Sequence, residues 1–358
     1  MEISKNDTKM LKGVAILFML LLHLFCQKEV NGLYETFPVI NGVPFVYYIR
    51  LFGDACVPIY CFVSGYGLFM VHSKEHKSNI MKNITRIFKL LINFWIVLVL
   101  FVAIGFLTGK TESFPGGIGE FFLNFFVLSN SYNGAWWFLQ TYIILVALAP
   151  LLTKLVRKYN SLSLLIVFGS IYLASYIQRI KHVFDFGDYI ALNAFVNAMV
   201  LLGTSLLPFI VGAIFAKEKV HSKLYGMCHD LSYKNTLCFI GIVMLVVIHF
   251  VYESMIIAPF TAIAFICFFN FMDKSNLIKQ IFTFFGNHST NIWLTHMFFY
   301  KSIFPEITFL PRYPIIIFGW LIVMCLTSSY VINFIYNPIT RIIEKRVLIM
   351  RDNQKAVG

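Results

Sequence analysis

Apolar residues are gathered into ten stretches, each of a length that suits a helix crossing a lipid bilayer. About 20 predominantly apolar residues span the hydrocarbon core. The stretches cover approximately residues 10–27, 45–70, 87–108, 136–153, 162–178, 190–216, 237–252, 255–272, 280–300 and 314–336. This pattern predicts an all-α, polytopic membrane bundle of about ten transmembrane helices over residues 1–340, followed by a short basic tail over residues 341–358.

A shorter apolar piece lies between the third and fourth stretches. It runs from Glu120 to Leu128, directly after the glycine-rich segment from Pro115 to Gly119. Because about ten helical residues are too few to cross the bilayer, this piece is predicted to be re-entrant or to lie at the membrane interface.

Composition and charge favour a membrane protein over a soluble enzyme. Of the 358 residues, 59% are apolar and 13% are charged, whereas soluble domains carry roughly 25% charged residues. If the N-terminus is cytoplasmic, 22 of the 29 Lys and Arg residues, Lys74 and Lys77 among them, fall on the cytoplasmic side. This asymmetry predicts two cytoplasmic termini and a multi-pass protein of the plasma membrane. It assigns the net charge of +12 to topology, with no nucleic acid as partner.

The first stretch carries a titratable side chain, His23, inside the membrane. His23 follows Lys12 by 11 residues, and a helix rises 1.5 Å per residue, so roughly 16 Å separate them. Lys12 then lies near the cytoplasmic boundary and His23 near or beyond the middle of the bilayer. One interpretation is a histidine hydrogen-bonded between helices, and the other is a proton-transfer group that faces a cavity.

Asp54 is the second titratable group expected inside the membrane. Its helix enters from the outer side, which places Asp54 at a depth comparable to that of His23. A carboxylate there would hold the His23 ring in one tautomer and stabilise its imidazolium form. The alternative is that Asp54 pairs with Arg50, four residues earlier on its own helix.

The ninth stretch contains five consecutive polar residues, Asn287 to Asn291, and then His296. Facing lipid would leave their polar groups without partners, which is costly. We expect either that they line water or substrate, with Asn287, Ser289, Asn291 and His296 as substrate-binding residues, or that they form polar contacts between helices.

The fourth stretch opens with aromatic residues at the outer interface. Trp136 and Trp137 are followed closely by Gln140. Such residues commonly form an aromatic belt at the membrane surface. The alternative is a wall on which a sugar ring stacks, with Gln140 as a hydrogen-bonding neighbour.

The motifs of familiar soluble chemistry are missing from the sequence. There is no serine-hydrolase elbow, Walker A loop, dinucleotide fingerprint or metalloprotease helix. The seven cysteines form no Cys-x-x-Cys pair and lie mostly in apolar stretches. They are therefore predicted to be small core residues, and no metal is expected.

Taken together, the motifs resemble the acyltransferase family 3 of bacterial integral-membrane O-acyltransferases. The resemblance covers nearly the whole chain, in the family's order of motifs. It rests on Lys12 to Ile16 with Leu22 and His23, Asp54 with Phe62 to Tyr66, Trp137 to Leu139, Ser289 to Leu294 with His296, and the closing segment Arg341 to Lys345. The most specific of these is a basic residue and a histidine separated by ten residues.

The resemblance implies transfer of an acyl group, commonly acetyl, from cytoplasmic acyl-coenzyme A to a hydroxyl of a cell-surface polysaccharide or its lipid-linked precursor. It implies a catalytic role for His23 and a donor-binding role for Lys12. His23 would act as a general base on the acceptor hydroxyl, or would briefly relay the acyl group, with Asp54 orienting it. The family usually has arginine at that position, so Lys12 keeps the positive charge but lacks the bidentate fork. The chain's length implies the stand-alone membrane form of the family.

Two other classes of function stay open. A transporter or flippase for a glycan or lipid-linked sugar would also need polar groups at mid-bilayer and interrupted helices, for which Pro58, Pro150, Pro208 and Pro259 are candidates. The lack of a visible inverted repeat speaks against it. The third class is a membrane sensor or assembly subunit, in which the polar groups serve helix packing.

Overall fold

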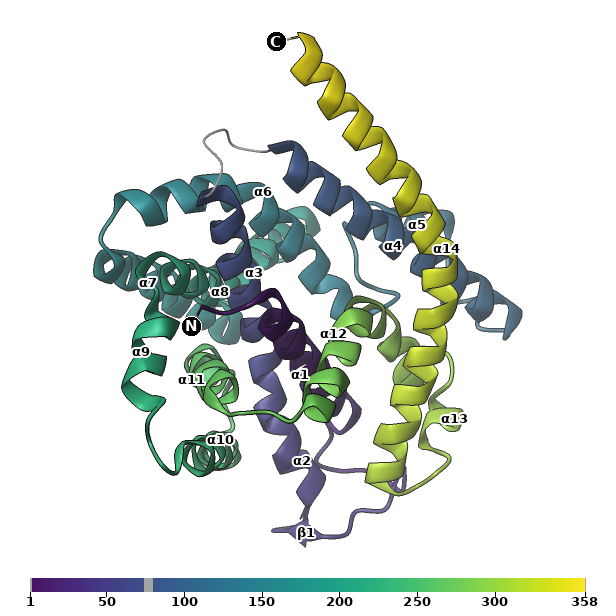
Figure 1. The fold of residues 1–358 in the computed structure, drawn as a ribbon. Coiled ribbons are helices and arrows are strands. Elements are labelled where there is room, and N and C mark those ends of the chain that lie inside the picture. The colour runs from purple at the N-terminus through teal and green to yellow at the C-terminus, as the bar shows by residue number, and fades with distance from the viewer. Residues whose placement is uncertain (1, 74–79, 358) are drawn as a thin grey trace. The chain divides into compact units, whose positions relative to one another are not determined.

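The computed structural model of the protein describes residues 2–73 and 80–357, and this part of the chain is almost entirely helical (Figure 1). Strand pairing in it is limited to one antiparallel pair of two-residue strands, β1 (Val39–Ile40) and β2 (Val43–Pro44). The predicted all-α class is confirmed. Lys74 and Lys77, expected on the cytoplasmic side, lie outside the described residues.

Every predicted stretch coincides with a helix or with consecutive helices. In chain order they are α1 (Lys5–Leu24), α2 (Phe45–Arg50) with η1 (Leu51–Ala55) and α3 (Cys56–Ser73), α4 (Ile80–Leu107), η2 (Gly134–Trp136) with α6 (Trp137–Lys158), α7 (Ser161–Lys181), α8 (Ile190–Glu218), α10 (Lys234–Val251), η3 (Met255–Ile257) with α11 (Ala258–Phe271), α12 (Asn276–Met297) and α14 (Pro314–Val357). Shorter helical elements lie between them, namely α5 (Ile118–Phe125), α9 (Val220–Cys228), η4 (Phe298–Ser302) and α13 (Pro305–Phe309). The short piece predicted after the glycine-rich segment is α5.

Seven segments of the described chain are long and apolar enough to cross a membrane, so the chain is a multi-pass membrane protein in a lipid bilayer. They are Phe45–Ser73, Ile80–Leu107, Gly134–Lys158, Ser161–Lys181, Ile190–Glu218, Lys234–Val251 and Pro314–Lys345. The other three predicted spans correspond to α1, α11 and α12. Every 18-residue window of α1 contains more than two charged residues, the polar run lowers the hydropathy of α12, and α11 has only 14 residues. The total of ten spans and the cytoplasmic termini stay predictions.

The chain forms two compact units, each with its own packed helices. Unit 1 consists of Met1–Ile80, Trp137–Ser289 and Arg312–Phe318, and unit 2 of Met81–Trp136, Thr290–Pro311 and Gly319–Gly358. Both α12 and α14 contribute residues to the two units. The predicted basic tail begins within α14, which continues as one helix to Val357.

In unit 1, α3 and α8 cross with their backbones in direct contact. A methyl group added to Gly65 would lie 1.9 Å from the carbonyl oxygen of Phe209. Reciprocally, a methyl group on Gly212 would lie 2.1 Å from the carbonyl oxygen of Phe62. Small residues permit this approach, which replaces the hydrophobic effect as a source of helix association in a bilayer.

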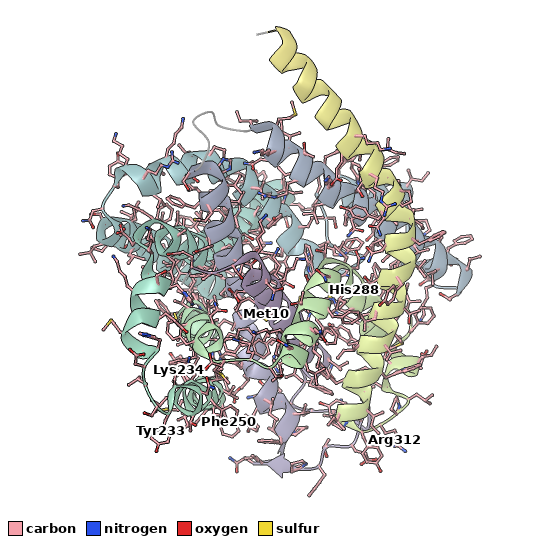
Figure 2. The ribbon with its side chains drawn as sticks, in the orientation of Figure 1. Met10, Tyr233, Lys234, Phe250, His288 and Arg312 are labelled. Carbon is pink, nitrogen blue, oxygen red and sulfur yellow. The ribbon has the colours of Figure 1, made fainter. Side chains whose placement is uncertain are left out.

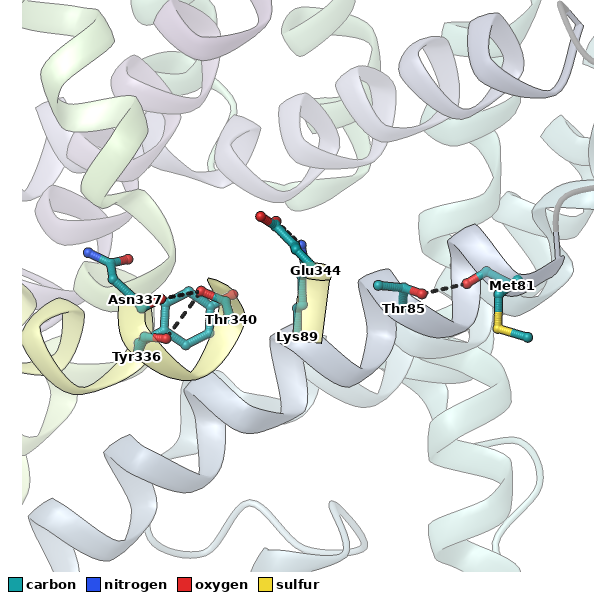
Figure 3. A network of polar contacts seen from close by, with 7 residues as sticks. All are labelled: Met81, Thr85, Lys89, Tyr336, Asn337, Thr340 and Glu344. Atoms are coloured by element: carbon teal, nitrogen blue, oxygen red, sulfur yellow. Dashed lines mark hydrogen bonds and ion pairs between the residues drawn. The ribbon is translucent and has the colours of Figure 1, made fainter. Parts of the chain in front are cut away.

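In unit 2, α4 and α14 are joined by an ion pair between Lys89 and Glu344 (Figure 3). The same view shows the hydroxyls of Thr85 and Thr340 donating hydrogen bonds to carbonyl oxygens of the preceding turn of their own helices. This bonding satisfies polar side chains within an apolar helix without a partner from elsewhere.

Candidate functional site

In unit 1, α1 packs against α3 and against the first part of α12 (Figure 1). Lys12 lies on α1 beside these contacts. A methyl group on Gly13 would lie 1.9 Å from the carbonyl oxygen of Phe282, and one on Gly286 would lie 2.1 Å from a carbonyl oxygen of α1. From α3, the Tyr60 hydroxyl donates a hydrogen bond to the carbonyl oxygen of Lys12 at 3.2 Å. The backbone that carries the half-buried Lys12 is therefore fixed by both neighbouring helices.

The segments that carry His23 and Asp54 are in direct contact. His23 is half-buried in the last turn of α1. A methyl group on Gly53 would lie 2.6 Å from both the Leu22 side chain and the Phe18 carbonyl oxygen. His23 directly follows Leu22 in the sequence, and Asp54 directly follows Gly53. The structure thus brings these two segments together, while the roles of the two side chains stay predictions.

Asp54 lies in a 3-10 segment, η1, that interrupts the predicted second span. In a continuous α-helix the carbonyl oxygen of Asp54 would accept a hydrogen bond from the backbone nitrogen of residue 58. That residue is Pro58, which has no N–H to donate. The tighter winding of Leu51–Ala55 follows from this missing donor and from the close approach of Gly53 to α1.

The alternative pairing of Asp54 with Arg50 is not formed. The Arg50 guanidinium instead lies over the ring of Tyr47, 4.2 Å from its centre. The half-buried Asp54 carboxylate makes neither a hydrogen bond nor an ion pair with any described residue, although the charges of Arg50 and Arg179 act on it from further away. Asp54 therefore retains its capacity to accept hydrogen bonds.

Four further predicted residues belong to unit 1. Ser289 is buried, donates to a carbonyl oxygen of the preceding turn at 2.9 Å, and interacts with the Tyr60 hydroxyl. The Tyr60 hydroxyl thus contacts both Ser289 and the backbone of Lys12. Trp137 and Gln140 are half-buried in the first turn of α6, and Asn287 is exposed. Substrate binding by these four stays a prediction.

Trp136 is a core residue of unit 2. Its ring is 1% exposed, and its indole nitrogen donates to the carbonyl oxygen of Leu294 at 3.0 Å. The ring packs edge-on against Phe94 and Phe298, with centroids 4.7 and 5.5 Å away. This geometry joins three elements of unit 2, and a stacking role toward a sugar, which stays a prediction, would require the ring to become accessible.

Asn291 is the centre of a buried polar network in unit 2. Its side-chain oxygen accepts a hydrogen bond from Asn93 of α4 at 2.6 Å. Its side-chain nitrogen donates to the Ser329 hydroxyl and to the side-chain oxygen of Asn333, both of α14 and both at 3.0 Å. This arrangement is the one expected of a polar contact between helices.

Replacing Asn291 with alanine is expected to destabilise the protein by about 1–3 kcal/mol, because Asn93 would lose its acceptor in a buried environment. Thermal unfolding in lipid nanodiscs measures the effect. Asn287→Ala, four residues earlier on the same helix but exposed, is the matched control and should leave stability unchanged. Unchanged stability in Asn291→Ala, together with a raised KM for the acceptor, would instead support substrate binding by Asn291.

His296 is fully buried in unit 2, and its tautomer follows from one contact. Its Nδ1 lies 2.7 Å from the carbonyl oxygen of Trp293. A carbonyl only accepts hydrogen bonds, so Nδ1 carries a proton and Nε2 is the acceptor nitrogen of the neutral ring. A substrate-binding role for His296 stays a prediction.

Lys274 is a half-buried cation that the sequence pattern did not single out. It lies between α11 and α12, where its ammonium group is 4.4 Å from the centre of the Phe269 ring and donates to the Met272 carbonyl oxygen at 2.9 Å. Burial, and secondarily the charge of Lys279, lower the pKa of Lys274 to about 8, against the opposing effect of Asp7. The sequence counts Lys274 only as one of the cytoplasmic basic residues. Its burial could not be predicted, because it depends on tertiary packing.

Within residues 2–73 and 80–357, no group of three or more His, Cys, Asp or Glu side chains has the arrangement to hold a metal ion. A family model described as an acyltransferase domain matches residues 8–334, nearly the whole chain. No curated protein and no solved structure matches the chain.

Proposed function

The chain belongs to the acyltransferase family 3, and from this premise we propose that it transfers an acyl group, acetyl in the first instance, from acyl-coenzyme A in the cytoplasm to a hydroxyl of a cell-surface polysaccharide or its lipid-linked precursor. The plasma membrane is the proposed location. One observation carries the proposal beyond the family. The Leu22–Gly53 contact joins the segments of His23 and Asp54, the two titratable groups expected at mid-bilayer.

The proposed reaction uses His23 as a general base. His23 takes the proton of the acceptor hydroxyl while the hydroxyl oxygen bonds to the thioester carbonyl carbon. The carbon–sulfur bond then breaks, and the proton on His23 passes to the departing thiolate, which leaves as free coenzyme A. Asp54, which makes no hydrogen bond with a described residue, stabilises the imidazolium that forms in between.

The donor phosphates are proposed to bind near the N-terminal end of α1. Lys274 lies over Phe269, whose ring packs on that of Phe282 with centroids 5.5 Å apart. The Phe282 carbonyl in turn touches Gly13, beside Lys12. These contacts place Lys12 and Lys274 at the same end of α1, where two ammonium groups suit the phosphates of coenzyme A.

The KM for acetyl-coenzyme A is expected to rise as the pH passes 8, because Lys274 then loses its charge. Below pH 8 the ammonium form predominates and KM is flat. If only that form binds phosphate, KM rises by about tenfold between pH 7 and pH 9. Initial rates in nanodiscs at varied donor concentration measure this dependence.

Two variants and a shortened donor test whether Lys274 causes the rise in KM. Lys274→Arg keeps its charge and should give a flat KM across this range, and Lys274→Met should give a raised and flat KM. S-acetylpantetheine, a donor without the nucleotide phosphates, should show no dependence on Lys274. A rise of equal size in the wild type and in both variants would assign the effect to a group other than Lys274.

The proposed function is tested with purified protein in nanodiscs, radiolabelled acetyl-coenzyme A, and surface glycan isolated from the cells that naturally make this protein. We expect label on the glycan in a form released by mild alkali, as an ester is, with one free thiol formed per ester. Passage of glycan across a sealed vesicle without labelling would favour the transporter instead. Transporters of this kind use broken helices. Two candidate prolines speak against that class, because α6 and α8 continue through Pro150 and Pro208, whereas the interruption of the second span at η1 is compatible with it.

A further inference from the structure

A polar hollow of about 410 Å³ opens in unit 1 just after the end of α1. Its lining comes mainly from the segment between α1 and α2, with Arg312 from the segment before α14, labelled in Figure 2. The volume falls in the range of sites that hold small organic ligands, roughly 300–1,000 Å³. A sugar ring fits within this space.

The walls of the hollow are fixed by contacts that span distant parts of unit 1. The backbone nitrogen of Glu35 donates to the carbonyl oxygen of Arg312 at 2.8 Å, and their side chains lie 3.9 Å apart as an ion pair. On the other side, Lys28 pairs with Glu253 at 2.8 Å. Hydrogen bonding within this second pair raises the pKa of Lys28 and lowers that of Glu253. The hollow is therefore largely pre-formed.

The hollow adjoins the end of α1 that carries His23. Tyr34, one of its lining residues, packs edge-on against Phe25, with ring centroids 5.3 Å apart. Phe25 caps α1 and follows His23 by two residues. If the N-terminus is cytoplasmic, the hollow lies on the outer side, at the opposite end of α1 from Lys12.

The charges around the hollow disfavour an anionic ligand. The two basic residues that line the hollow both form ion pairs, Lys28 with Glu253 and Arg312 with Glu35. Glu29 also lines the hollow and makes no ion pair with a described residue, which leaves an excess negative charge. Carboxylates, amides and hydroxyls all form hydrogen bonds with sugar hydroxyls. Besides the Glu29 carboxylate, the hollow offers the amide of Asn31 and the hydroxyl of Thr36.

From these features we propose that the hollow is the acceptor subsite and holds an uncharged sugar unit, whose hydroxyls donate to Glu29 and hydrogen-bond with Asn31 and Thr36. The inference rests on the proposed acyl transfer. The subsite selects against uronic acids and phosphorylated sugars, because their charge would lie beside the unmatched Glu29 carboxylate.

The test compares methyl β-glucoside, methyl N-acetyl-β-glucosaminide and methyl β-glucuronide as acceptors for protein in nanodiscs. We expect the glucuronide to have a KM at least about tenfold above those of the two uncharged sugars. Glu29→Gln should raise the KM of the uncharged sugars several-fold and leave the KM of acetyl-coenzyme A unchanged. The ratio of the KM of the glucuronide to that of the uncharged sugars should therefore fall. Asp188→Asn, which alters an exposed carboxylate of unit 1 outside the hollow, is the matched control and should change neither value.

A binding measurement without donor separates this proposal from the proposed function. Saturation-transfer NMR should detect methyl β-glucoside bound to the wild type and to Asp188→Asn, with a weaker signal in Glu29→Gln. Binding of this kind without acyl transfer would uphold the hollow as a sugar site and overturn the proposed reaction. Two outcomes would overturn the subsite and leave the reaction standing. In the first, acyl transfer occurs but Glu29→Gln changes neither the binding of sugars nor their KM. In the second, the glucuronide is as good an acceptor as the uncharged sugars.

Discussion

Replacing His23 with alanine is expected to slow acyl transfer by about 10²- to 10⁴-fold, which is the usual contribution of a positioned general base. The half-buried imidazole lies in the last turn of α1, next to the contact between Leu22 and Gly53. The initial rate of label transfer from acetyl-coenzyme A measures the loss. The KM of the donor should change little, because donor binding is assigned to the other end of α1.

The alternative for His23, a hydrogen bond between helices, makes a different prediction. His23→Gln keeps a polar side chain of similar size that cannot take up a proton at neutral pH, so the base mechanism predicts the same loss as in His23→Ala. A near-normal rate in His23→Gln would assign His23 to helix packing. His229→Ala, which removes an exposed histidine of unit 1, should leave the rate unchanged.

Asp54 is expected to act through His23, so Asp54→Asn should lose less activity than His23→Ala, about 10- to 100-fold. If Asp54 acts only by orienting the imidazole, combining Asp54→Asn with His23→Ala should cost no more than His23→Ala alone. Circular dichroism and size-exclusion profiles of the variants check that the fold is retained.

Hydropathy predicted where the helices lie because that signal is local. Each apolar stretch became a helix or consecutive helices, since a backbone within a bilayer must satisfy its own hydrogen bonds. Pro58 was a candidate for an interrupted helix, but the 3-10 winding of η1 was not predicted. The approach of Gly53 to α1 is a tertiary contact between residues far apart in the chain.

The polar residues show the same division between local and tertiary information. The run from Asn287 to Asn291 was recognised as unsuited to lipid, yet only the structure shows that Asn287 is exposed while Asn291 bonds to α4 and α14. The partners of Asn291 are far away in sequence, so no spacing rule identifies them. Likewise, Trp136 and Trp137 are neighbours in sequence, but the first is in the core of unit 2 and the second is half-buried in unit 1.

Adding a single methyl group to α3 is expected to have opposite effects at two glycines only two residues apart. In Gly65→Ala the methyl would lie 1.9 Å from the Phe209 carbonyl oxygen, so α8 must move away. Forcing such a core apart typically costs about 1–3 kcal/mol, and backbone on both sides offers no side chain that can yield. Gly67 has open space around its α-carbon, so Gly67→Ala should be neutral or stabilise the helix by up to about 1 kcal/mol.

Thermal unfolding of the two variants in nanodiscs measures this difference under identical conditions. Because Gly212 touches α3 as Gly65 touches α8, Gly212→Ala should also destabilise the protein. The double variant should cost less than the sum of the single changes, since helices already separated by one methyl group accommodate the second more easily. Equal stabilities of Gly65→Ala and Gly67→Ala would mean that α3 and α8 do not cross at this distance in the bilayer. Acyl transfer should fall with stability in Gly65→Ala and persist in Gly67→Ala, because α3 also holds Lys12 in place through Tyr60.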